Sequence, residues 1–174
     1  MTMKIPIALT LAIGAVVLLG QNAAQSPSNN VPLSENKTLL LEKKVLSLEA
    51  ARQMAAAAIN EAEKHNWRGT VAIVDDGGWL ILLERMDNAA MTASVELAAG
   101  KARSAALFKK PSQNLEDSIN HGRYAAITAP GFVEMKGALP VVVDGQVVGA
   151  IGSSFATPDQ DVQVSQAGLD ALNQ

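Results

Sequence analysis

The stretch TVAIVDDGGWLILL, residues 70–83, decides the fold of this chain. Two apolar runs flank the turn residues Asp75–Gly78, and an Asp-Gly step between apolar runs is the strongest local signal for a β-hairpin. We therefore predict one strand over Thr70–Val74 and a returning strand over Trp79–Leu83.

A second hairpin of the same kind is predicted nearer the C-terminus. Pro140–Val143 and Gln146–Ile151 are apolar runs on either side of Asp144–Gly145. Gly149 and Gly152 interrupt the end of the second run, a placement typical of a bulge or of a close backbone approach. Two such hairpins predict an antiparallel sheet rather than a doubly wound parallel sheet.

Two amphipathic or Ala-rich segments predict helices next to the first hairpin. Ser47 is a favoured N-cap residue, and apolar side chains recur at helical spacing from there to about His65. A second helix is predicted over Ser94–Phe108, and Pro111 stops it. The small side chains of this second helix leave room for another element to approach closely.

Two further helices are predicted towards the C-terminus. Ser112 is predicted to cap a short helix that ends near His121, and residues 122–137 are predicted to form a loop. Residues 157–160, Thr-Pro-Asp-Gln, form a capping box with proline at the first helical position, and the helix is expected to end near Leu172. The sum is a single α+β domain over residues 47–174, with three to four helices covering one or both faces of the sheet.

The N-terminal residues are typical of an export signal. Lys4 precedes an apolar run over Ile5–Gly20, and a short positive start with such a run indicates a signal peptide. We predict a signal peptide over residues 1–24, a linker and domain lead-in over residues 25–46, and a periplasmic or secreted protein. The alternative is an uncleaved anchor, although the run is short for a membrane span of roughly 20 residues.

Composition excludes several classes of function. The formal net charge is −3, and no cluster of Lys or Arg is longer than a pair, so the concentrated basic surface of a nucleic-acid-binding protein is missing. The absence of cysteine excludes disulfides, thiolate catalysis and cysteine-ligated zinc.

The two histidines, His65 and His121, lack the spacing of a zinc site. As isolated histidines, both are interpreted first as surface or helix-end residues. An imidazole is nevertheless a natural axial ligand for haem iron, and His121 lies close to Tyr124 and Arg123 in a loop-like region. We therefore name His121 as the candidate metal ligand, Tyr124 as a further candidate and Arg123 as a partner for a haem propionate. Methionine is a weaker alternative as a ligand, at Met86, Met91 or Met135.

Further candidates lie at the start of the last helix and among isolated charges. Ser153 and Thr157 flank a helix N-terminus, whose free amides suit an anion such as a propionate. A bulged strand leading into a helix cap explains the same residues without a ligand. Lys101, Arg85 and Asp75 could act on a small carboxylate substrate, but a solvated face with local ion pairs is the simpler interpretation.

Several stretches of the chain resemble one known family in sequence and in order. They are residues 72–80, 84–89, 101–108, 137–152 and 156–161, followed by Ala167-Gly168. Together they resemble the GlcG/HbpS family, also called the haem-degrading domain family, over nearly all of residues 47–172. Two positions depart from the family pattern: Asn88 and Phe155 each stand where glycine is usual, and the ring of Phe155 is expected to narrow a pocket or fill an interface.

The resemblance implies an antiparallel sheet flanked by helices, and assembly into dimers or larger rings. It also implies haem binding in some members, with haem degradation or iron release, and a sensor-kinase partner for some relatives. The predicted function is therefore an exported haem-binding protein that degrades haem or releases its iron. The alternative is a non-enzymatic oligomeric module that binds a small molecule or a sensor partner, with the Ala-rich second helix packed between subunits.

Overall fold

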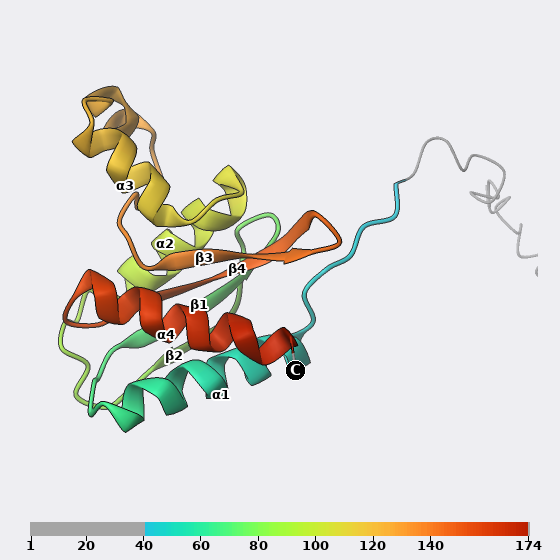
Figure 1. Cartoon of the computed structure of the whole chain (residues 1–174), viewed down its shortest axis with the longest axis vertical. Helices are drawn as coiled ribbons and strands as arrows, with labels where there is room; N and C mark the ends of the chain where they lie inside the picture. Colours follow the sequence, from blue (N-terminus) through green and yellow to red (C-terminus); the bar gives the residue numbers. More distant parts are fainter. Residues whose placement is uncertain (1–40, 174) are drawn as a thin grey trace, which may run out of the picture. The chain divides into compact units, whose positions relative to one another are not determined.

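A four-stranded antiparallel sheet in the order β2-β1-β4-β3 lies at the centre of the computed structural model, which describes residues 41–173 (Figure 1). β1 (Thr70–Asp75) pairs with β2 (Leu80–Arg85), and β3 (Ala138–Val143) pairs with β4 (Gln146–Ser154). Both predicted hairpins are confirmed. β1 also pairs with β4, which joins the hairpins into one sheet and confirms the α+β class.

The two Asp-Gly signals produce different turns. Asp144 and Gly145 both have positive φ angles, 49° and 76°, as a two-residue hairpin turn of type I′ requires. In the first hairpin only Gly78 has a positive φ, 75°, and the Asp75 carboxylate accepts a hydrogen bond from the Trp79 N–H at 2.8 Å. Trp79 therefore belongs to the turn, one residue before β2, and not to the strand predicted for it.

Helices cover both faces of the sheet. α1 (Leu48–Lys64) and α4 (Pro158–Asp170) pack against each other and against one face, and α2 (Ser94–Phe108) packs on the other (Figure 1). The core on the α1 and α4 side includes Val71 and Ile73 of β1, which alternate with residues that face α2. The core uses mainly small and branched aliphatic side chains, in keeping with an aromatic content of only 3%.

Two glycines allow backbone segments to approach each other closely. A Cβ atom on Gly152 would lie 2.5 Å from the carbonyl oxygen of Ala98 in α2, and one on Gly149 would lie 2.4 Å from the carbonyl oxygen of Val74. The β3–β4 register also shifts beside Gly149, between Val141 and Val142. Both the predicted bulge and the predicted close approach are confirmed.

The Ala-rich side of α2 packs within the chain. Ala98, Ala102, Ala105 and Ala106 are all buried, and three of these belong to the cluster that α2 forms with the sheet. The prediction that these small side chains serve close packing between subunits is therefore wrong, because β4 and its glycine already occupy that surface.

The helix caps match the sequence at two of three predicted positions. Ser47 caps α1 through the Ala50 N–H, and Thr157 caps α4 through the Gln160 N–H. Ser112 does not cap α3 (Ser112–Asn120), which begins after Pro111 without a side-chain cap. The Ser112 hydroxyl instead accepts a hydrogen bond from the Ala138 N–H at 2.9 Å, so it fastens α3 to β3.

The compact unit starts slightly earlier than residue 47, at Glu42. Lys43 forms an ion pair with Asp76 at 2.9 Å, and Lys44 forms one with Asp144, so the end of the predicted lead-in contacts both hairpin turns. The predicted signal peptide and most of the predicted linker lie outside the described residues. Among the helices of residues 41–173, none combines the length and the hydropathy that a membrane span requires.

Candidate functional site

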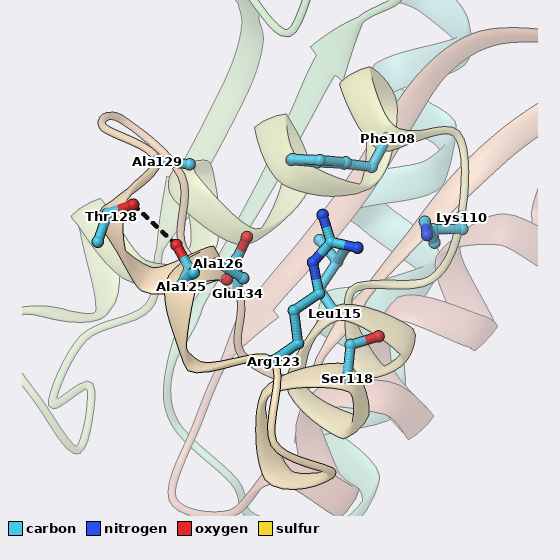
Figure 2. Close-up of a pocket in the computed structure, with 10 residues that line it drawn as sticks. All are labelled: Phe108, Lys110, Leu115, Ser118, Arg123, Ala125, Ala126, Thr128, Ala129 and Glu134. Atoms are coloured by element: carbon cyan, nitrogen blue, oxygen red, sulfur yellow. Dashed lines mark hydrogen bonds between the residues drawn. The ribbon is translucent and has the colours of Figure 1, made fainter.

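A cavity of about 350 Å³ lies where α3 and the segment after it project from the sheet (Figures 1 and 2). Its walls come from the end of α2, from α3, from the short 3₁₀ helix η2 (Tyr124–Thr128) and from the chain that leads into β3. This volume is at the lower end of the range for small-molecule sites. The lining residues are Phe108, Lys110, Leu115, Ser118, Arg123, Ala125, Ala126, Thr128, Ala129 and Glu134.

The cavity combines apolar walls with three charged side chains. Lys110 and Arg123 supply cations, and Figure 2 shows the Arg123 guanidinium and the Glu134 carboxylate pointing into the cavity from different sides. The Oε2 atom of Glu134 is buried and has no hydrogen-bond partner. A buried polar atom without a partner is uncommon in native proteins and indicates a missing ligand or water.

A second, more apolar cavity of about 240 Å³ adjoins the first. It shares Ala126, Ala129 and Glu134 with the first cavity and adds Phe132 and other apolar side chains. The Phe132 ring contacts the Phe108 ring edge-on, with centroids 4.9 Å apart. The two cavities together offer a charged end and an apolar end, as an amphipathic ligand requires. The residues that only the second cavity contributes are Ile119, Ile127, Phe132 and Met135.

Of the predicted site residues, Arg123 is the one that the structure places in the cavity wall. His121 and Tyr124 flank it in sequence and are exposed, but neither lines the cavity. The His121 Nδ1 atom lies 2.6 Å from the carbonyl oxygen of Asp117. Because a carbonyl oxygen only accepts, Nδ1 carries the proton, and the Nε2 atom of the neutral ring is the one with a lone pair for a metal.

Ser153 and Thr157 do not reach this cavity. Ser153 is fully buried, and its hydroxyl accepts a hydrogen bond from Ser165 at 2.9 Å. Thr157 is exposed at the start of α4, where its oxygen accepts the Gln160 N–H at 3.3 Å. The structure thus separates the two residues from Arg123, and the burial of Ser153 removes it as a contact for a ligand.

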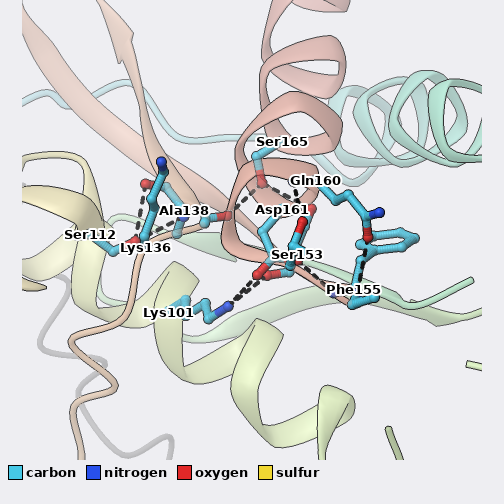
Figure 3. A network of polar contacts seen from close by, with 12 residues as sticks. Lys101, Ser112, Lys136, Ala138, Ser153, Phe155, Gln160, Asp161 and Ser165 are labelled. Carbon is cyan, nitrogen blue, oxygen red and sulfur yellow. Dashed lines mark hydrogen bonds and ion pairs between the residues drawn. The ribbon is translucent and has the colours of Figure 1, made fainter. Parts of the chain in front are cut away.

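A buried ion pair, shown in Figure 3, joins the middle of α2 to the first turn of α4. The Lys101 ammonium donates to Asp161 at 2.6 Å and to the Ser153 carbonyl at 3.3 Å, and both side chains are at most 5% exposed. Burial raises the pKa of the Asp161 carboxyl, although hydrogen bonds from Lys101 and from the Phe155 N–H oppose that rise. The interpretation of Lys101 as part of a solvated face, and the alternative that it contacts a substrate, are both wrong because Asp161 of α4 covers it.

The remaining sequence candidates have structural roles. His65 ends α1, stacks on Trp67 with ring centroids 4.4 Å apart and contacts Glu61. Phe155 is buried in the core against Gly69, so its ring neither narrows a pocket nor reaches an interface. Asn88 has a φ of 58°, in the left-handed region that asparagine tolerates better than most residues.

Glu134 and Lys110 were missed by the sequence analysis. Glu134 is the only charged residue between Arg123 and Lys136, and a lone acid in such an apolar stretch was a usable signal. Lys110 gave no comparable signal, since a Lys-Lys pair at a helix end is ordinary. No group of three His, Asp or Glu side chains in residues 41–173 is arranged to hold a metal ion.

Comparison with known families gives an assignment for most of the domain. The family model described as "Haem degrading protein HbpS-like" matches residues 46–170. The chain belongs to this family. The resemblance to the GlcG/HbpS family that the sequence motifs indicated is therefore confirmed.

Individual relatives agree with the family assignment. The chain is 44% identical to Protein GlcG of Escherichia coli K12 over 112 residues, which cover 64% of this chain and 83% of GlcG. A double mutant of Streptomyces reticuli HbpS superposes with a TM-score of 0.73 at 28% identity, covering 94% of this chain and 99% of HbpS. A PduOC–haem complex superposes with a TM-score of 0.69 at 28% identity, covering 75% of this chain and 96% of PduOC.

Proposed function

We propose that this HbpS-like protein binds haem at the paired cavities beside α3 and η2. The observation that carries the proposal is the cavity of about 350 Å³, whose wall places Arg123 and Lys110 next to apolar side chains. The family description and the haem complex of the structurally similar PduOC support the same ligand.

The residues present suit haem in two respects. Arg123 and Lys110 would pair with propionates, since guanidinium and ammonium groups form strong charge-assisted hydrogen bonds with carboxylates. The apolar residues of the adjoining cavity, Phe132 and Met135 among them, would contact the macrocycle. When bound, haem supplies an iron centre able to activate oxygen. The small volume of each cavity indicates that the macrocycle extends across both.

His121 remains our proposed iron ligand, and Tyr124 remains a neighbouring candidate. Because neither residue lines the two cavities, haem held there would have to extend towards the end of α3 for the iron to reach His121. The hydrogen bond from Nδ1 to the Asp117 carbonyl fixes the tautomer that leaves Nε2 able to bind iron. His121 is exposed at the end of α3, so binding there requires no disruption of the core.

An absorbance titration with hemin tests this function. The wild-type protein is expected to give a saturable Soret band, and His121→Ala is expected to shift that band because the iron ligand changes. His65→Ala is the matched control, since His65 ends a different helix and is held by Glu61 and Trp67. A wild-type spectrum no different from that of hemin with an unrelated protein would exclude haem binding.

We further propose that bound haem is degraded or gives up its iron, and that the protein is exported. Support for turnover comes from the family description alone. Adding ascorbate in the presence of catalase to the hemin complex separates the outcomes, because degradation bleaches the Soret band and simple binding preserves it.

Export is supported by Lys4 and the apolar run over Ile5–Gly20. The mass of the protein recovered from the periplasm or medium is expected to match cleavage after Ala24, whereas an uncleaved anchor would retain the full mass in the membrane fraction.

A patch of exposed apolar side chains near the cavities favours the oligomeric binding module as the alternative. Phe108, Ile127 and Met135 line the cavities and are exposed, Ile127 to 70%. Trp79 is 69% exposed, and Arg103 contacts both its ring and that of Phe132. Contiguous exposed apolar surface is typical of protein interfaces. Light scattering coupled to gel filtration decides the point, because a strict monomer at micromolar concentration would exclude this alternative.

A further inference from the structure

Glu134 lines the proposed site, and one of its carboxylate oxygens has no hydrogen-bond donor from the protein. Its Oε2 atom is buried, lacks a partner and belongs to a residue that lines both cavities. A carboxylate oxygen removed from water loses its hydration, and that loss is offset only when a donor approaches it.

The donors near Glu134 in the larger cavity are already used or too far away. The Ser118 hydroxyl donates to the Asn114 carbonyl at 2.7 Å, and the Thr128 hydroxyl donates to the Ala125 carbonyl at 2.8 Å. Neither Lys110 nor Arg123 forms an ion pair with Glu134 within 4 Å in the described part of the chain. The other lining side chains are apolar, so the side chains of the cavity offer Glu134 no donor, and a bound ligand is able to supply one.

We infer that Glu134 determines the specificity of the site by accepting a hydrogen bond from a carboxylic acid of the ligand. Haem then binds with one propionate ionised against Arg123 and Lys110, and with the second propionate sharing one proton with Glu134. The inference rests on the proposed haem site and adds to it that binding takes up a proton.

The physical basis is the repulsion between two carboxylates in a poorly solvated place. Two carboxyl groups in contact do not both ionise, because removing the second proton would place like charges side by side. The charges that share the larger cavity with Glu134 are Lys110 from the end of α2 and Arg123 from the end of α3, and η2 contributes none. Glu116 of α3 also lies near this segment, but it accepts the Lys136 N–H at 2.5 Å.

The test uses protoporphyrin IX, which carries both propionates but has no iron. Removing the iron separates the two kinds of contact, because the porphyrin then binds through its propionates and its macrocycle without an iron ligand. We would measure the dissociation constant by fluorescence between pH 6 and 8.5 for the full chain, for Glu134→Gln and for Glu96→Gln. Glu96 is an exposed residue in the first turn of α2, so it serves as the matched control.

The wild type and Glu96→Gln are expected to bind up to about tenfold more weakly for each pH unit, over the range in which the free carboxyls are ionised and the complex still holds the shared proton. Glu134→Gln is expected to bind with little dependence on pH, because an amide both donates to an ionised propionate and accepts from a neutral one. The dimethyl ester of the porphyrin is expected to lose the pH dependence with every variant.

The two proposals fail in distinguishable ways. If no variant binds hemin or protoporphyrin, the proposed function is wrong and the inference falls with it. If the wild type binds but Glu134→Gln has the same affinity and the same pH profile, the haem site stands and the role of Glu134 is overturned. Thermal unfolding of each variant, with Glu134→Ala as a second substitution, confirms that a lost pH dependence is not a loss of fold.

Discussion

Two polar clusters on this domain, one in the core and one at the cavity, differ in how their hydrogen bonds are satisfied. In the core, Lys101 contacts Asp161 and the Ser153 carbonyl, and the other Asp161 oxygen accepts the Phe155 N–H at 2.5 Å. In the cavity, Glu134 keeps a buried oxygen without a partner. The partners of Asp161 compensate for its burial, whereas the Glu134 oxygen is open to a donor from a ligand or from water.

The two clusters are joined by a short segment of chain. Ser165, beside Asp161 on α4, donates to the Gly137 carbonyl at 2.8 Å. The preceding residue, Lys136, donates its N–H to Glu116 of α3, and Glu134 lies two residues earlier. The buried cluster therefore anchors one end of the segment whose other end forms the cavity wall.

The largest expected effect is the loss of stability when the buried ion pair is broken. Lys101→Met leaves the Asp161 carboxylate buried without its cation, so the free energy of unfolding should fall by about 3–5 kcal/mol. Urea unfolding measures this change. Lys64→Met, which removes a surface pair with Glu61, should cost no more than about 1 kcal/mol.

The comparison between the clusters would fail if these two lysine variants were equally stable. A second check is the double variant Lys101→Met with Asp161→Asn, which buries no charge and should recover part of the lost stability. Below their unfolding transitions, both variants should keep most of their hemin affinity, because neither residue lines the cavity.

At the cavity we expect a smaller effect, and we expect it on hemin affinity rather than on stability. Arg123→Ala removes one charge-assisted contact with a propionate, so the dissociation constant for hemin should rise about tenfold. The free energy of unfolding should change by less than about 0.5 kcal/mol, because the Arg123 side chain is exposed. Arg52→Ala, an exposed arginine on α1, should change neither quantity, and a similar loss of affinity there would indicate a nonspecific charge effect.

The smallest expected effect concerns a surface carboxylate that belongs to neither cluster. Hydrogen bonds from Gln163 and Lys64 lower the pKa of Glu61 from 4.5 to about 2. A lowered pKa in the folded state stabilises the protein above the pKa of the unfolded state, and that stability is lost as the pH falls from about 4.5 towards 2. Glu61→Gln should therefore give a shallower loss of stability over this range than the wild type, measured as urea midpoints. Equal slopes would show that the Glu61 contacts are too solvated to matter.

Local signals predicted the elements well because they act within a few residues. Ser94 and Phe108 bound α2 as predicted, since Pro111 and the local apolar pattern decide where that helix ends. The Asp144-Gly145 turn followed from the φ angles that these two residues tolerate. Ser112 resembled a cap locally, and the prediction failed because Ala138, 26 residues later, uses its hydroxyl.

The site was predicted only in part, for a related reason. Arg123 was named from its sequence neighbours, and the structure places it in the cavity. Ser153 was named from its place beside a helix start, but Ser165 and the packing of α4 bury it. Glu134 was missed because its Oε2 atom is buried only in the folded chain. There, α3, η2 and the segment before β3 come together around it.

The sequence by itself determined the two hairpins, the helices, the α+β class and the family, because hydrophobic periodicity, turn residues and motif order are written along the chain. The tertiary structure decided which polar residues are satisfied and which face a cavity. Lys101 and Asp161 are 60 residues apart, and nothing in either neighbourhood shows that they meet. Burial and hydrogen bonding depend on contacts between distant segments. Only the folded chain therefore distinguishes charged residues of a buried ion pair from charged residues that line a cavity.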